Sequence, residues 1–62
     1  MLYAVQIKYL TYDEDGVKRW HTHRTKWYGS LSEAWKERWE YEQKNGANWA
    51  ESSSAAMRKD ED

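Results

Sequence analysis

The sequence predicts a small α+β domain: an antiparallel β-hairpin, with room for a third C-terminal strand, packed against one α-helix (ββα or ββαβ). Three observations predict it. Residues suited to burial alternate over 2–12, an Asp15-Gly16 turn leads into a second strand-like run, and a helix-capping sequence begins at Ser30. The 62 residues suffice for one domain. We expect residues 1–50 to form it, and residues 51–62 to be a weakly ordered segment or a short third strand or helix.

The first strand is expected over residues 2–12. Side chains of a strand point alternately to its two faces, and here those suited to burial share one face: Tyr3, Val5, Ile7, Tyr9 and Thr11. The other face is mainly polar, with Leu10 as the exception. This pattern is typical of an antiparallel sheet with one face in water.

The second strand is expected over residues 17–28, and its register depends on the length of the preceding turn. A two-residue loop at Asp15-Gly16 places these side chains on the face of the first strand's apolar residues: Trp20, Thr22 and Tyr28. A three-residue loop with a glycine bulge places a different set there: His21, His23 and Trp27. We favour the two-residue loop because it buries Trp20 and leaves both histidines in water.

A helix is expected from the capping box at Ser30 to about Lys44. The Ser30 hydroxyl can accept the backbone N–H of Glu33, and Asn45-Gly46 is a suitable stop. The helix carries one stripe for packing on the sheet: Leu31, Ala34, Trp35, Arg38 and Trp39. We expect Trp35→Ala or Trp39→Ala to cost about 3–5 kcal/mol.

Composition limits both the core and the function. There are five Trp and five Tyr but few aliphatic residues, so the core must be largely aromatic. Cysteine is absent, which excludes disulfides and thiolate metal sites. The net charge of −1 is too small to imply bulk attraction to nucleic acid or to an anionic membrane. No signal-peptide pattern and no run of about 20 apolar residues is present, so we expect a cytoplasmic location and no membrane partner.

Metal-binding and catalytic patterns are weak. His21 and His23 have the spacing of two metal ligands on one side of a strand, but no third ligand stands at a defining distance. We therefore interpret them as two exposed strand histidines. Catalysis needs a nucleophile, a base and an orienting group that converge in a pocket, which a chain with two histidines and this size does not suggest. We expect no catalytic residue, no metal, no cofactor and no enzyme activity.

The run 18–28 is the most informative segment, because it interleaves cations with aromatic residues. A two-stranded ribbon can enter the DNA major groove, and such residues also suit single-strand stacking. In layout the chain resembles the sheet-plus-helix DNA-binding domains at the amino end of some phage integrases, with Thr25 to Ala34 as the comparable stretch. It offers two strands before the helix where that layout has three. Nucleic-acid binding is therefore one alternative, with Arg24 and Lys26 as its first residues.

The hairpin, the Ser30-to-Ala34 helix start and the short terminal segment also resemble the plan of small phage-encoded host-interaction proteins, such as inhibitors of host RNA polymerase and anti-CRISPR proteins. That resemblance implies a compact, non-enzymatic protein-binding module, which is the function we favour. The candidate surface residues are of the types that dominate interface energies: Tyr12, Arg19, Arg24, Lys26, Trp27, Tyr28 and Trp49. A further alternative is a self-associating protein whose free hairpin edge pairs with a second copy into a homodimer.

Overall fold

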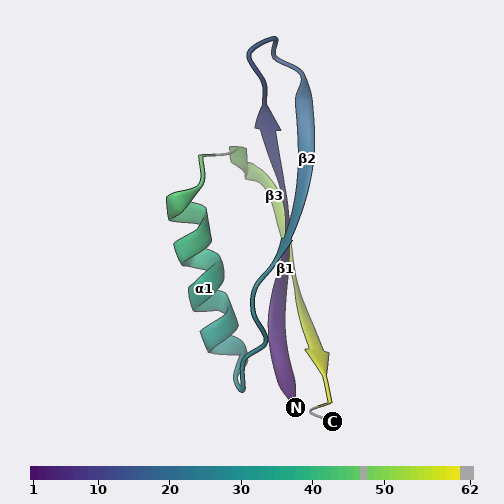
Figure 1. Cartoon of the computed structure of the whole chain (residues 1–62), viewed down its shortest axis with the longest axis vertical. Coiled ribbons are helices and arrows are strands. Elements are labelled where there is room, and N and C mark those ends of the chain that lie inside the picture. Colours follow the sequence, from purple (N-terminus) through teal and green to yellow (C-terminus); the bar gives the residue numbers. More distant parts are fainter. Residues whose placement is uncertain (47, 61–62) are drawn as a thin grey trace.

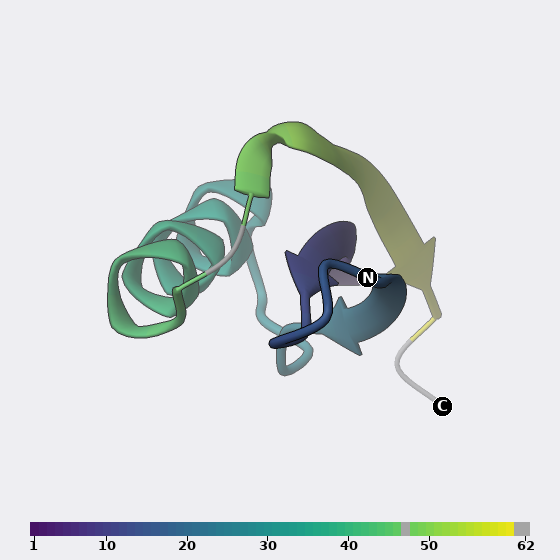
Figure 2. The ribbon, with the colours of Figure 1, turned by 90° about the horizontal axis from the view of Figure 1, so that it is seen from above.

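A computed structural model describes residues 1–46 and 48–60. They form, in chain order, β1 (Leu2–Tyr12), β2 (Lys18–Arg24), α1 (Leu31–Lys44) and β3 (Asn48–Lys59). The strands make one antiparallel sheet in the order β2-β1-β3, and α1 lies along one of its faces (Figures 1 and 2). The predicted α+β class is confirmed, and the third strand is a full edge strand of 12 residues.

The core lies between β1 and α1. Val5, Ile7 and Ala34 are completely buried and in contact, as the alternation along β1 predicts. Larger side chains pack around them while keeping part of their surface in water: Tyr9, Tyr28, Leu31, Trp35, Tyr41 and Trp49. The aromatic rim thus completes a core that has few aliphatic residues.

The hairpin has the three-residue loop, so the favoured two-residue loop is wrong. Asp13 pairs with Val17 across the loop, and the Asp13 carboxylate accepts the backbone N–H groups of Asp15 and Val17 at 3.0 and 2.9 Å. Gly16 takes a positive φ of 79°, which suits glycine. The Asp13 side chain therefore stabilises the longer loop, and this shifts the faces of β2 by one residue.

The shift exchanges the positions expected for Trp20 and the histidines. His21 pairs with Tyr9 and His23 with Ile7, so both histidines share the face that α1 covers. Trp20 pairs with Leu10 on the other face and is 62% exposed. The expectation of a buried Trp20 and exposed histidines is therefore wrong.

A second irregularity follows the end of β2. Thr25 bonds to Val5, whereas Tyr28 exchanges two backbone hydrogen bonds with Tyr3, so residues 26 and 27 together stand opposite Ala4. This extra residue returns Tyr28 to the helix-covered face, where it packs against the core.

The helix begins and ends as expected. The Ser30 hydroxyl accepts the N–H of Glu33 at 3.4 Å, and α1 runs to Lys44. The packing stripe differs from the predicted one at one position. Its residues after Leu31 include Ala34, Arg38 and Tyr41, which are four and three positions apart, and Trp39 is not among them. Trp39 is 61% exposed, so its expected role in the core is wrong.

Beyond the helix the hairpin projects as an arm. The molecule measures 45 × 19 × 15 Å, and the turn between β1 and β2 lies at one end of the long axis, past α1 (Figure 1). β3 pairs with β1 only as far as Leu10, so the arm consists of two strands. The start of β1 and the end of β3 lie at the opposite end of the molecule.

Candidate binding surface on the open face of the sheet

The face of the sheet that points away from α1 is the candidate site. In the described part of the chain no helix covers it, and we call it the open face. Its members follow from the alternation of β1 and from the cross-strand pairs. They are Leu2, Ala4, Gln6, Lys8, Leu10 and Tyr12 of β1, Lys18, Trp20, Thr22 and Arg24 of β2, and Ser53, Ala55, Met57 and Lys59 of β3.

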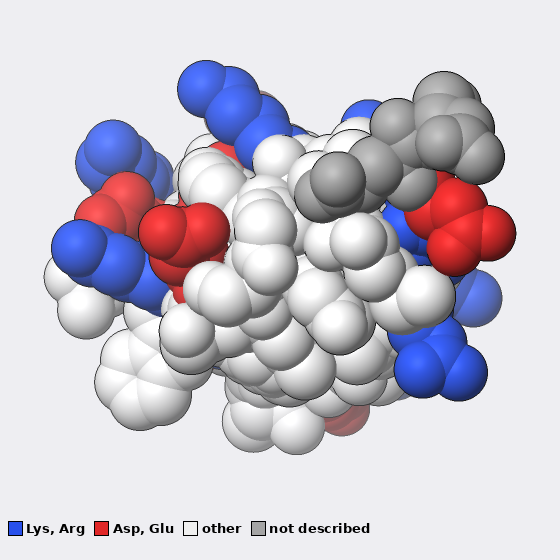
Figure 3. Space-filling view, turned by 90° about the horizontal axis from the view of Figure 1, so that it is seen from below, with Lys and Arg blue, Asp and Glu red and all other residues white. Residues whose placement is uncertain are grey.

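Positive charge collects on the open face. Its side chains include four cations, all exposed: Lys8, Lys18, Arg24 and Lys59. Carboxylates lie near them as well: Glu51 lines the same pocket as Lys8, and Asp60 directly follows Lys59 in the chain. Seen from the end at which β1 begins, several Lys and Arg atoms stand at the right of Figure 3, with acidic atoms beside them, and other Lys and Arg atoms stand at the left and at the top. The net charge of −1 therefore hides a local positive field.

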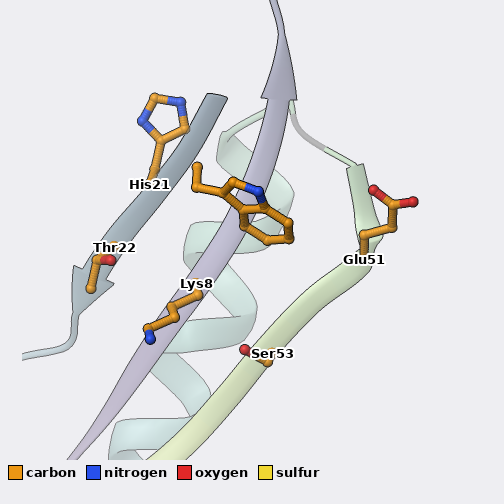
Figure 4. Close-up of a pocket in the computed structure, with 6 residues that line it drawn as sticks. Lys8, His21, Thr22, Glu51 and Ser53 are labelled. Atoms are coloured by element: carbon orange, nitrogen blue, oxygen red, sulfur yellow. The ribbon is translucent and has the colours of Figure 1, made fainter. Parts of the chain in front are cut away.

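The open face is hollowed between its strands. A shallow pocket of about 490 Å³ is lined by one group of side chains from all three strands: Lys8, Trp20, His21, Thr22, Glu51 and Ser53. In Figure 4, Lys8, Thr22 and Ser53 surround the hollow, and the His21 ring points away from it. A second hollow of about 220 Å³ shares Lys8 and Ser53 and continues toward Gln6 and Ala55. Together they form a groove along the sheet.

An irregularity of β3 creates this groove. Lys8 pairs with Ser53, but Leu10 pairs with Asn48, so residues 49–52 of β3 stand opposite Tyr9 alone. The extra residues bend β3 away from β1, as its first part shows in Figure 1. They also carry Trp49 back onto the core, where its indole N–H donates to the Asn45 carbonyl at 3.0 Å.

Trp27 holds two cations at the terminal end of the open face. The Arg24 guanidinium carbon lies 5.0 Å and the Lys59 ammonium nitrogen 4.5 Å from the centre of its ring. Arg24 belongs to one edge strand and Lys59 to the other, so a ring close to both lies across β1. Ala4, the β1 residue at that level on the same face, is completely buried.

The seven residues predicted from the sequence divide into two groups. Three lie at the open face, Tyr12, Arg24 and Trp27, whereas the backbone N–H of Lys26 donates to the Glu37 carboxylate of α1 at 3.1 Å. The other three have structural contacts elsewhere. Arg19 pairs with Asp13 at 3.3 Å, Trp49 packs in the core, and the Tyr28 hydroxyl donates to the Glu37 carboxylate at 2.5 Å.

Sequence reasoning did not select Lys8, Trp20 or Lys59. Trp20 was assigned to the core through the wrong register, although the alternative loop already exposed it. Lys59 lay in the segment expected to be weakly ordered, and its pairing with Leu2 places it on the sheet. Lys8 was placed on the wet face, but nothing in the sequence joined it to a groove.

The two histidines are engaged in aromatic contacts. The His23 ring stacks on Tyr41 with centroids 4.0 Å apart, and the His21 ring stacks on Tyr9 at 5.1 Å. His21 also shares a 2.7 Å hydrogen bond with the Thr11 hydroxyl. Within residues 1–46 and 48–60, no three His, Asp or Glu side chains are grouped as metal ligands.

Two tyrosines on the helix side have raised pKa values. The hydrogen bond to the Glu37 carboxylate, followed by burial and the nearby negative charges, raises the pKa of Tyr28 to about 12. Burial, followed by the 2.7 Å hydrogen bond with the Tyr9 hydroxyl, raises the pKa of Tyr41 to about 12. Both tyrosines favour the neutral form in the fold, so their contribution to stability is complete below pH 10.0 and is lost as the pH rises through about 12.

Changing Glu37→Gln is expected to lower the pKa of Tyr28 toward 10.0 while leaving that of Tyr41 near 12, because the charged acceptor is removed from Tyr28 alone. An absorbance titration of tyrosinate between pH 9 and 13 measures this. Glu40→Gln is the matched control and should produce a smaller shift, since Glu40 acts on Tyr28 only through its charge. Identical titration curves for the Glu37→Gln and unmodified proteins would contradict the assignment.

Comparison with known proteins found no matching family model, no matching curated protein and no matching solved structure. In the described chain, no helix combines the length and the apolar character needed to cross a membrane. The function is therefore argued from the geometry of the open face.

Proposed function

We propose that the chain is a small non-enzymatic binding module that holds single-stranded nucleic acid on its open face. The observation that carries the proposal is the coincidence of four cations, an exposed Trp20 and a groove on the one sheet face without a helix. Cations attract the phosphates, and an exposed indole offers a surface on which any base can stack. The cytoplasmic location expected from the sequence is compatible with such a ligand.

The dimensions suit a short single strand. From Lys18 to Lys59 the open face follows β1 from Tyr12 to Leu2, roughly 33 Å at 3.3 Å per residue. Sheet surfaces of this kind bind on the order of four or more nucleotides. The groove begins at Trp20, which lines it beside Lys8, and it leads past Gln6 and Ala55 toward the Arg24–Trp27–Lys59 cluster.

The charge distribution favours a single strand over a duplex. The DNA major groove admits a two-stranded ribbon, but the tip of this hairpin carries Asp13, Glu14 and Asp15. These carboxylates repel the phosphates that border the groove. The acids of α1 likewise point away from the open face, so a flexible strand can follow the basic surface without meeting them.

A protein partner, the function favoured by the sequence, is the second candidate. One specific observation supports it: the hairpin arm exposes Tyr12 (48%) and Val17 (53%) close to Trp20. Exposed aromatic residues of this kind are typical anchors of protein interfaces. Such an interface tolerates salt far better than a phosphate-binding surface does, which separates the two candidates.

The test is the affinity for a short single-stranded oligonucleotide, measured by fluorescence anisotropy over a range of salt concentrations. A strand that contacts all four cations is expected to give a log–log slope of about −3, at about −0.7 per phosphate. Lys8→Gln and Arg24→Gln should each reduce the magnitude of that slope by about 0.7. Lys36→Gln, an exposed change on α1, is the matched control and should leave it unchanged.

Three results would count against the proposal. The first is no saturable binding, the second is an affinity that is insensitive to salt, and the third is an equal effect of Lys36→Gln and Lys8→Gln. Salt-tolerant capture of a defined protein that depends on Tyr12 and Val17 would support the second candidate in its place.

A further inference from the structure

The outer edge of β3 has hydrogen-bonding groups free for another strand. On β1 the odd-numbered residues bond to the β2 side, as the two bonds between Tyr3 and Tyr28 show, so the even-numbered residues bond to β3. Their partners on β3 are odd-numbered. Within the continuous pairing, the even-numbered residues of β3 therefore direct their backbone N–H and C=O groups outward: Ser54, Ala56 and Arg58.

This edge lacks the protection that edge strands normally carry. Residues 52–57 read Ser-Ser-Ser-Ala-Ala-Met, with no charge and no proline, and they pair with β1 without interruption from Ser53 to Lys59. The other edge differs, because β2 carries Lys18, Arg19 and Arg24 and then bulges at residues 26 and 27. Of the two edges, only that of β3 is a smooth template for pairing.

We propose that a second copy of this chain pairs antiparallel with β3, about a twofold axis at Ala55, to form a six-stranded sheet. The charges select this register. An axis at Ala55 places Glu51 opposite the partner's Lys59, and symmetry repeats the pair. An axis at Ser54 also matches the hydrogen-bonding groups, but it sets Glu51 opposite a methionine and leaves Lys59 opposite a tryptophan.

The surroundings of β3 leave space for the second copy. Small side chains meet across the proposed seam, mainly serines and alanines. α1 packs chiefly on β1, and Figure 2 shows the C-terminal part of β3 on the side of the molecule away from α1. The pairing also has a physical benefit, because each copy completely buries only five apolar side chains in its described part: Ala4, Val5, Ile7, Leu10 and Ala34.

The pairing does not depend on the proposed function, although it affects the open face. A twofold axis perpendicular to the sheet keeps both helices on one side and joins the two open faces on the other. The dimer would thus present a continuous open face of twice the width across the strands. The two proposals can therefore fail separately. A monomer that binds nucleic acid would contradict only the pairing, and a dimer that does not bind it would contradict only the proposed function.

Sedimentation equilibrium of the whole chain over a wide concentration range tests the proposal, with mass as the readout. We expect a reversible monomer–dimer equilibrium. Ala56→Pro is expected to leave a folded monomer, because the N–H of Ala56 points outward and its loss spares the bonds to β1. Ala55→Pro is the matched control, and it should disturb the fold because that N–H bonds to β1.

A charge exchange provides the second, milder test. Glu51→Lys places like charges opposite each other at both ends of the seam and should weaken the dimer about tenfold. Adding Lys59→Glu to the same chain should restore it. A protein that stays monomeric at every concentration would overturn the proposal. So would a folded Ala56→Pro variant that remains dimeric, or a double exchange that fails to restore what Glu51→Lys lost.

Discussion

Ile7→Ala is expected to lower the free energy of unfolding by about 2–5 kcal/mol, a large part of the total stability. Ile7 is completely buried between β1 and α1, in contact with Val5 and Ala34. Truncations of this kind cost about 2–5 kcal/mol, whereas a 62-residue domain has a total stability of roughly 3–9 kcal/mol. Circular dichroism during urea unfolding measures the change in the free energy of unfolding.

Trp39→Ala is the control for this prediction. It removes a larger side chain, but Trp39 is 61% exposed, so we expect a change within about 1 kcal/mol. Comparable destabilisation by Trp39→Ala and Ile7→Ala would mean that α1 presents a different face to the sheet.

Trp20→Ala is expected to weaken single-strand binding by roughly 5- to 150-fold without unfolding the domain. The reason is the loss of one base-stacking surface, which contributes about 1–3 kcal/mol. Fluorescence anisotropy with the same oligonucleotide measures the affinity, and circular dichroism confirms that the variant is folded.

Trp39→Ala serves as a closely matched control for binding as well. Trp20 and Trp39 are 62% and 61% exposed, so the two variants remove the same side chain from equally exposed positions on different elements. The account requires that only Trp20→Ala weakens binding. Equal losses would indicate nonspecific adsorption to exposed indoles and not a site on the open face.

Local signals in the sequence predicted the elements well. The first strand, the Ser30 cap and the helix end depend on neighbours within a few residues, and all three lie where the pattern placed them. For residues 51–62 the sequence allows a third strand only as one of several alternatives. Its Ser-Ala run has little intrinsic strand preference, and it is a strand because β1 offers an edge with which to pair.

The register of β2 against β1 was predicted wrongly from the sequence. The choice between a two- and a three-residue loop depended on whether the Asp13 carboxylate bonds to the N–H groups of Asp15 and Val17, and that geometry is not visible in a pattern of apolar residues. The preference for a buried Trp20 over buried histidines was also too simple. Tyr9 and Tyr41 provide aromatic faces on which the imidazole rings stack.

The candidate site was predictable only in part. Arg24 and Trp27 stood out because cations and aromatic residues alternate along one strand. Lys59 reaches the same ring from a strand 32 residues later in the chain, and such a long-range contact requires the sheet order. The groove itself arises from the irregular pairing of β3, which leaves no pattern in the sequence.

The five tryptophan indole N–H signals in a proton–nitrogen NMR spectrum test the central claim most directly, during titration with a single-stranded oligonucleotide. The account predicts that the signals of Trp20 and Trp27 shift progressively and saturate together, while that of Trp39 on α1 stays in place. A shift of Trp39 without Trp20 and Trp27, or no shift of any signal at saturating oligonucleotide, would contradict the open face as the binding surface.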